Sequence, residues 1–117
     1  MLIKKGCRFE SDFSDGILKI TLLGEIDHHS AVATRSSIDA KIYELRPREL
    51  VLDLSSIDFM DSSGLGLVMG RYALMQKLGG ELFVINPSER ALKIFELAGL
   101  CKIIKNKDAK GEKSDEK

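Results

Sequence analysis

The chain has 117 residues, and its 18 basic and 18 acidic side chains give a formal net charge of zero. The length predicts one domain with one core, and the balanced charge provides no broad basic surface for nucleic acid or an anionic membrane. No apolar run reaches the roughly 20 residues that cross a bilayer, and residues 1–6 lack the apolar core of a signal peptide. We therefore expect a cytoplasmic protein whose partner is another protein.

The cysteine and histidine content predicts neither a disulfide nor a metal site. Cys7 and Cys101 lie far apart in the sequence, and a domain of this size folds around its own core, so we expect two free thiols. The two histidines, His28 and His29, are adjacent, and no spacing of His and Cys closes a tetrahedral zinc site.

The first two predicted elements form an antiparallel hairpin. Residues 7–13 have the composition of a strand, residues 14–16 (Ser-Asp-Gly) that of a tight turn, and residues 17–23 form a second strand with apolar alternation. Gly24 is expected to end the second strand.

A helix and a central strand follow the hairpin. The helix begins near Asp27 or Ser30, either of which is a suitable cap, and it stops at Pro47. Residues 49–54 form a short apolar run, which indicates a strand buried on both faces. Residues 55–61 are expected to be a connection.

The second helix is predicted to begin at Ser62 or Ser63 and to end at Leu78, because apolar residues recur at helical spacing and two glycines follow. Residues 81–85 then form another strand. Strands that alternate with helices require parallel pairing with right-handed crossovers. With the opening hairpin, the predicted fold class is α/β with a mixed sheet.

The last predicted elements are a third helix over 87–98 and a short edge strand over 102–105. Apolar residues of this helix include Leu92, Phe95 and Leu97. From Asn106 onward nearly every residue is charged or small, so this segment has little to bury. We place the domain at 1–106 and a polar, mobile tail at 107–117.

The segment from Phe59 to Gly66 is the most informative for function, because it joins the end of a buried strand to the start of a helix. Ligand sites on α/β sheets gather at such places. The hydroxyls of Ser62 and Ser63 face unpaired backbone N–H groups and the positive end of the helix dipole, where a phosphate is tolerated. The residues alone leave a simpler alternative open, in which Asp61 or one of these serines only caps the helix.

The same segment does not match a catalytic motif. A nucleophile elbow requires Gly-x-Ser-x-Gly, and Met60 occupies the first glycine position relative to Ser62. Gly64 and Gly66 are not part of a phosphate-binding loop, because the remaining Walker residues are missing. We therefore expect no catalytic residue.

Three other features have both a functional and a structural interpretation. Asp27, followed by two histidines, is expected on the same rim as Ser62, but it can also be a plain helix cap. Arg71 can be a surface charge on the second helix. Met60 can fill the core, as methionine usually does, or be exposed beside the turn for a partner.

Two motifs resemble those of the STAS-domain family, and specifically its anti-sigma factor antagonists. Residues 24–31 (Gly-Glu-Ile-Asp-His-His-Ser-Ala) are similar to the first motif of the family, and residues 59–66 (Phe-Met-Asp-Ser-Ser-Gly-Leu-Gly) are similar to its phosphorylation motif. Further agreement runs in order through most of residues 8–105. The paired histidines point to the sporulation branch of the family.

The resemblance implies a single STAS-like domain that works in a partner-switching cycle. Its expected partners are an anti-sigma factor that is also a serine kinase, a serine phosphatase and, indirectly, a sigma factor. The kinase would supply ATP, so this chain needs no cofactor of its own. Ser62 matches the phosphoacceptor, and the expected partner-binding residues are Asp27, Met60, Asp61, Ser63, Gly64, Gly66 and Arg71.

Two rival functions stay open at this point. A small-molecule or nucleotide-sensing STAS module would need a concave apolar pocket beside the Ser62 turn. A weak hydrolase would turn over substrate without any partner.

Overall fold

The computed structural model describes residues 6–105. The predicted polar tail, 107–117, lies outside the described residues. The elements in chain order are β1 (Cys7–Ser14), β2 (Ile17–Ile26), α1 (His28–Leu45), β3 (Glu49–Met60), α2 (Ser62–Lys77), β4 (Glu81–Ile85), α3 (Glu89–Leu97), the short 3-10 turn η1 (Cys101–Ile103) and β5 (Ile104–Lys105).

The predicted antiparallel hairpin is confirmed as β1 and β2. Its turn consists of Asp15 and Gly16, whose φ angles are +54° and +79°. Two consecutive residues with positive φ are typical of the tight hairpin turns that Asp-Gly sequences favour. The turn sets a register in which Phe13 lies opposite Leu18, and Cys7 opposite Gly24.

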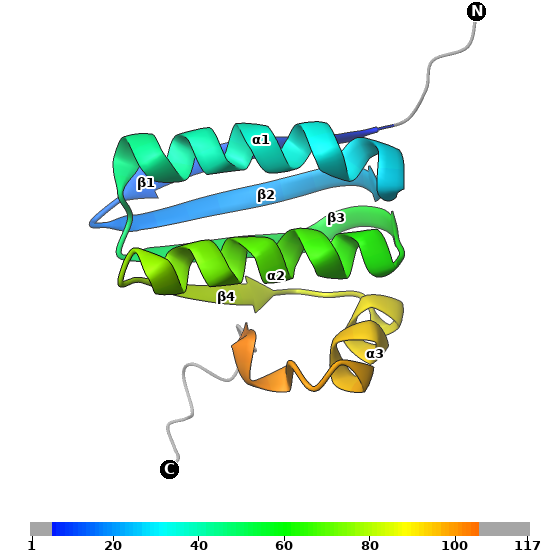
Figure 1. The fold of residues 1–117 in the computed structure, drawn as a ribbon. Helices are drawn as coiled ribbons and strands as arrows, with labels where there is room; N and C mark the ends of the chain where they lie inside the picture. Colours follow the sequence, from blue (N-terminus) through cyan, green and yellow to red (C-terminus); the bar gives the residue numbers. More distant parts are fainter. Residues whose placement is uncertain (1–5, 106–117) are drawn as a thin grey trace, which may run out of the picture.

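The five strands form one mixed sheet in the order β1-β2-β3-β4-β5. Only β1 and β2 are antiparallel, and β3 has the predicted central position between β2 and β4. The helices α1 and α2 lie side by side over one face of this sheet, and α3 lies beyond the end of β4 (Figure 1). The predicted α/β class with a mixed sheet is therefore confirmed.

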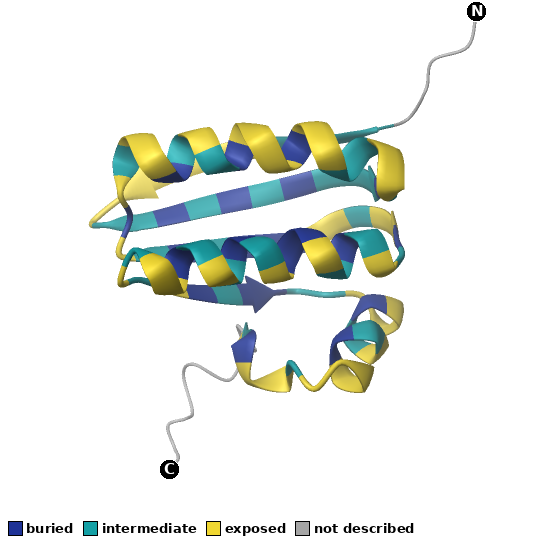
Figure 2. Cartoon of the chain, in the orientation of Figure 1, coloured by how far each residue is buried: buried dark blue, intermediate teal, exposed yellow. Residues whose placement is uncertain are grey.

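The core lies between the sheet and the two long helices (Figure 2). Alternate residues of β2 and β3 point toward the helices, as the two-residue period of a strand requires. The buried side chains in this layer include Leu18, Ile20, Leu22, Leu50, Leu52, Ile38, Ile42, Leu67, Val68 and Met75. α3 adds Ala91 and Phe95 to the same core, while its Leu97 is 85% exposed.

The predicted connection over 55–61 is wrong, because β3 continues to Met60. Beyond Asp53, β3 has passed the end of β4 and pairs with the end of β2 alone, with two register shifts. Ser55 and Ser56 are exposed in this two-stranded ribbon. Their polar side chains favour a loop in the sequence, but hydrogen-bonded pairing with β2 holds the backbone of this segment in a strand. For the same reason Gly24 does not end β2, which runs on to Ile26.

The predicted helices are confirmed with small changes at their ends. α1 begins at His28 and ends at Leu45, where Arg46 adopts φ +48° as the carboxy-terminal cap. α3 begins at Glu89, with Ser88 as its cap. The predicted edge strand over 102–105 is shorter than expected, since η1 occupies its first half.

Candidate functional site

The two sequence motifs meet where β2 and β3 end. Ile26 pairs with Met60 in the parallel ladder, and the next residue on each strand is an aspartate that caps a helix. The backbone N–H of Asp61 donates to the carbonyl oxygen of Ile26 at 3.4 Å. Asp27 and Ser62 therefore lie on one rim of the sheet, as the sequence predicted.

Asp27 is the cap of α1, and Ser30 supports it. The Asp27 Oδ1 atom accepts a hydrogen bond from the Ser30 backbone N–H at 2.9 Å, and the Ser30 Oγ atom accepts one from the Asp27 backbone N–H at 3.1 Å. This is a capping box, which satisfies two free backbone donors at once. The hydrogen bond from the Ser30 backbone N–H lowers the pKa of Asp27 below its ordinary value.

Of the three residues that the sequence offered as a cap for α2, Asp61 is the one that caps it. The Asp61 Oδ1 atom accepts from the Ser63 backbone N–H at 2.7 Å. Neither Ser62 nor Ser63 uses its hydroxyl for capping, and within residues 6–105 neither hydroxyl forms a side-chain hydrogen bond. Ser62 is exposed and Ser63 is half-buried. The cap therefore leaves both hydroxyls available at the helix start.

Two of the predicted partner-binding residues lie under the rim instead of on it. Met60 is only 3% exposed, and Gly64 is buried. A Cβ atom at Gly64 would overlap Cγ of Met60 and would lie 2.8 Å from its Sδ. The prediction that these two residues face a partner is corrected, because their contact with each other seats the first turn of α2 on the strand end.

Arg71 is also buried, at 5% exposed, so it is not a surface charge. Its Nε atom lies 2.7 Å from Asp39 Oδ1 on α1, and its Nη1 atom donates to the Leu67 carbonyl oxygen at 3.2 Å. Burial lowers the pKa of Arg71, while the charge of Asp39 opposes that shift. Arg71 therefore joins α1 to α2 instead of contacting a partner, and the sequence reasoning did not identify Asp39.

A groove runs between the first halves of α1 and α2, next to the rim. Its volume is about 230 Å³, and its walls are His28, Ala31, Val32 and Arg35 of α1 with Ser63, Gly66 and Leu67 of α2. We call it the α1–α2 groove. Arg35 was not predicted as a site residue, although it lies seven positions after His28 and so on the same face of the helix.

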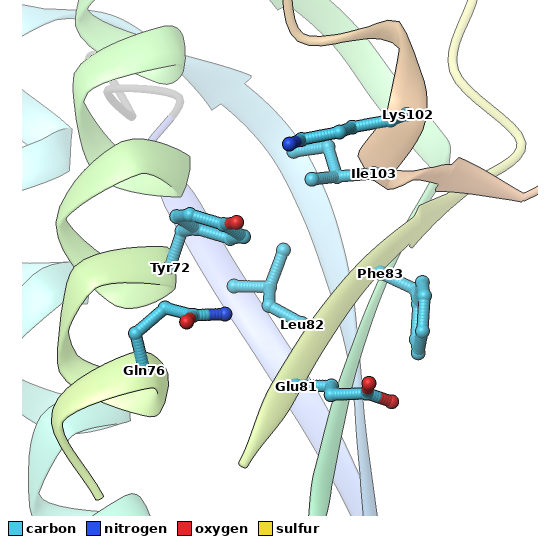
Figure 3. Close-up of a pocket in the computed structure, with 7 residues that line it drawn as sticks. All are labelled: Tyr72, Gln76, Glu81, Leu82, Phe83, Lys102 and Ile103. Atoms are coloured by element: carbon cyan, nitrogen blue, oxygen red, sulfur yellow. The ribbon is translucent and has the colours of Figure 1, made fainter. Parts of the chain in front are cut away.

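The two hollows that flank α2, the α1–α2 groove and a second one, are small for an organic ligand. On the other side of α2, a hollow of about 130 Å³ has Tyr72 and Gln76 on one wall and Leu82 and Ile103 on the other (Figure 3). A depression of about 500 Å³ on α3 is lined by four residues of that helix alone. Small-molecule sites are enclosed pockets of about 300–1,000 Å³. This geometry does not favour the small-molecule alternative.

Among residues 6–105, no three His, Cys, Asp or Glu side chains come together as a possible metal site. No helix in this range is long and apolar enough to span a bilayer.

Comparison with known proteins places the chain among regulators. The family model described as the STAS domain matches residues 8–112. The anti-sigma F factor antagonist of Paenibacillus polymyxa is 36% identical over 97 residues, which is 83% of each chain. The anti-sigma-B factor antagonist of Bacillus subtilis is 35% identical over 89 residues, 74% of this chain and 78% of the relative.

Solved structures agree with this placement. The unphosphorylated anti-sigma factor antagonist SpoIIAA matches with a TM-score of 0.76 and 30% identity, covering 85% of this chain and 87% of that one. The phosphorylated Bacillus SpoIIAA matches with a TM-score of 0.71 and 30% identity, covering 85% and 90%. The resemblance seen in the two motifs is confirmed, as is the expectation of a regulator that is not an enzyme. The chain belongs to the STAS-domain family, among its anti-sigma factor antagonists.

Proposed function

We propose that the unphosphorylated chain binds a cytoplasmic anti-sigma factor that is also an ATP-dependent serine kinase, and so frees the sigma factor. Phosphorylation of Ser62 by that kinase ends the binding, and a serine phosphatase restores it. The relatives are antagonists of anti-sigma factors, and a solved relative has a phosphorylated form. Both facts support this cycle.

The observation that carries the proposal is that the Ser62 hydroxyl is exposed and is not used to cap α2. Asp61 supplies the helix cap through its own carboxylate. Ser62 is therefore exposed at the first position of α2, without a structural hydrogen bond of its side chain to the described residues. A kinase can reach this hydroxyl without breaking any contact that holds the domain together.

Ser62 is a better acceptor than Ser63 for a geometric reason. Ser63 is half-buried and forms part of the wall of the α1–α2 groove. Its backbone N–H is held by Asp61 at 2.7 Å, which fixes the residue in the first helical turn. We therefore assign the phosphate to Ser62, and the partner surface to the rim residues Asp27, Asp61, Ser63 and Gly66.

The phosphate acts through local charge in this account. A phosphoserine carries about −1.5 to −2 charges at neutral pH. The amino terminus of α2 accommodates that charge in the free domain, because its backbone N–H groups and dipole are positive there. Against a partner carboxylate about 6 Å away, the repulsion is roughly 1 kcal/mol in water and about 5 kcal/mol at an effective dielectric near 20. Since 1.4 kcal/mol is about tenfold in affinity, the upper value opens the complex.

We further infer that the target belongs to the sporulation pathway and not to the general stress response. Two anti-sigma F factor antagonists are 36% and 38% identical to this chain. Anti-sigma-B factor antagonists are 28%, 30% and 35% identical. The adjacent His28 and His29 support the same assignment.

The experiment is a reconstitution with the anti-sigma factor kinase and sigma factor from the same genome. The unphosphorylated chain should displace the sigma factor from the complex, and prior treatment with kinase and ATP should abolish the displacement. Anti-sigma factors of the F and B types, tested in parallel, decide between the two pathways. A chain that leaves both sigma complexes intact contradicts the proposed function.

A further inference from the structure

The exposed face of α2 continues from Ser62 as a row of very small residues. Ser62, Gly66 and Gly70 are spaced by four, so they lie above one another on one face of the helix. A Cβ atom at Gly66 or Gly70 would meet no atom within 4 Å. Glycine destabilises a helix interior relative to alanine, and packing inside this domain does not require it at either position.

Apolar side chains border this row. Val32 of α1 is 50% exposed, and Met69 of α2 is 47% exposed. Ala31 and Leu67 form part of the floor and walls of the α1–α2 groove. Together, the α1–α2 groove and the row of small residues beside it form a shallow apolar track, which is open to solvent and about as long as the first halves of the two helices.

Arg35 gives this track a positive charge that the domain itself does not neutralise. It is exposed, lines the α1–α2 groove, and forms no ion pair or hydrogen bond with the residues the structure describes. The nearby carboxylate, Asp39, is paired with Arg71 at 2.7 Å. Burial is the main cause of the lowered pKa of Arg71, and the charge of nearby Arg35 lowers it further.

We propose that the α1–α2 groove receives a helix of the anti-sigma factor, with Gly66 and Gly70 as the point of close approach and an acidic side chain beside Arg35. This inference rests on the proposed function and names the part of the partner that binds. The form of the track argues for a helix, because α1 and α2 lie side by side in one layer (Figure 1). A third helix fits the depression between two such neighbours, and small residues let it approach closely.

The same geometry explains how the phosphate acts on the partner. Ser62 lies one helical turn before Gly66 and directly before Ser63, and both of these neighbours line the groove. A charge of about −1.5 to −2 there exceeds the single positive charge of Arg35. Phosphorylation therefore reverses the sign of the charge that the partner's acidic side chain meets.

The test is the affinity of the full chain for the cognate anti-sigma factor kinase with ADP, measured by calorimetry. Arg35→Glu should weaken binding at least tenfold, whereas Arg35→Lys should stay within about threefold of the wild type. Gly70→Leu should also weaken binding at least tenfold, because its side chain fills the track. If the leucine variant does not fold, Gly70→Ala, which adds one methyl group into open space, is measured in its place.

Arg8→Glu is the matched control for charge reversal. Arg8 is exposed on β1 and alternates with Cys7 and Phe9, which pack against the core, so it points away from α1. The affinity of the Arg8→Glu variant for the anti-sigma factor kinase should stay within twofold of the wild type. If either Arg35→Glu or Gly70→Leu binds within twofold of the wild type, the groove is not the helix site, while the proposed function stands. A wild-type chain that does not bind overturns the proposed function and this inference with it.

Discussion

Ile26 and Met60 lie opposite each other at the ends of two parallel strands, and each is followed by an aspartate that caps a helix. Two segments more than 30 residues apart in sequence thus begin their helices at one rim. The exposed hydroxyl of Ser62 belongs to this rim because Asp61 holds the helix start by its own side chain.

Gly64→Ala should destabilise the domain by about 1–3 kcal/mol, the usual cost of overpacking a filled site. The added methyl group would overlap Cγ of Met60, which is itself buried. Urea unfolding measures the change. Gly66→Ala is the matched control, since its Cβ atom meets nothing within 4 Å, and it should stabilise α2 by about 0.5–1 kcal/mol. Equal effects of the two substitutions would show that the Met60 contact does not matter.

Arg71→Met should cost about 1–2 kcal/mol of unfolding free energy. The substitution keeps an apolar side chain of similar length but leaves Asp39 without its partner. Breaking a fully buried ion pair costs about 3–5 kcal/mol, and the Asp39 side chain, at 29% exposed, keeps part of its hydration. Lys77→Met, at the exposed end of the same helix, should change stability by less than about 0.5 kcal/mol. Similar losses of unfolding free energy in both variants would show that the Arg71–Asp39 pair does not stabilise the contact between α1 and α2.

Asp27 should make folding stability depend on pH in the acid range. Its pKa is lowered in the folded state by the Ser30 backbone N–H, so its stabilisation is fully present above the ordinary aspartate pKa of about 3.9. The stabilisation is lost as the pH falls through the lower, folded-state pKa. Asp27→Asn keeps a capping side chain but does not titrate. The difference in unfolding free energy between wild type and variant should therefore shrink from pH 6 to pH 3, and a constant difference would contradict the assignment.

Phosphorylation should leave the fold of the free domain unchanged. Solved SpoIIAA matches this chain in both its unphosphorylated and its phosphorylated form, with TM-scores of 0.76 and 0.71. Amide NMR shifts on phosphorylation should be confined to residues 59–66 and 27–30. Changes in shift or exchange protection spread along residues 49–54 would instead indicate a conformational switch.

Most of the fold could be predicted from the sequence because local signals agreed with the tertiary structure. The Asp-Gly turn, the start of the apolar run at Glu49 and the stops at Pro47 and Gly79 all mark real boundaries within one residue or two. The second half of β3 could not be predicted, since Ser55, Ser56 and Asp58 resemble a loop and only pairing with β2 makes them a strand.

The position of the site could be predicted from the sequence, but which of its residues are buried could not. Asp27 and Ser62 each follow a predicted strand, and this order predicts that both lie on the same rim of the sheet. Met60 and Arg71 are buried although the motif resemblance placed them among the partner-binding residues, because a motif does not show which side of a helix start faces the core. Arg35 and Asp39 were missed because their importance depends on how α1 packs beside α2, which a single sequence does not reveal.

The assignment of Ser62 as the acceptor is the central claim, and phosphate incorporation tests it most directly. The wild-type chain, Ser62→Ala and Ser63→Ala should each be incubated with the cognate kinase and ATP, and the phosphorylated site mapped by mass spectrometry. Ser62 is exposed and not engaged in capping, and the neighbouring Ser63 is half-buried. We expect no phosphate on Ser62→Ala and stoichiometric phosphate at Ser62 in Ser63→Ala. Full phosphorylation of Ser62→Ala at Ser63 would contradict the account.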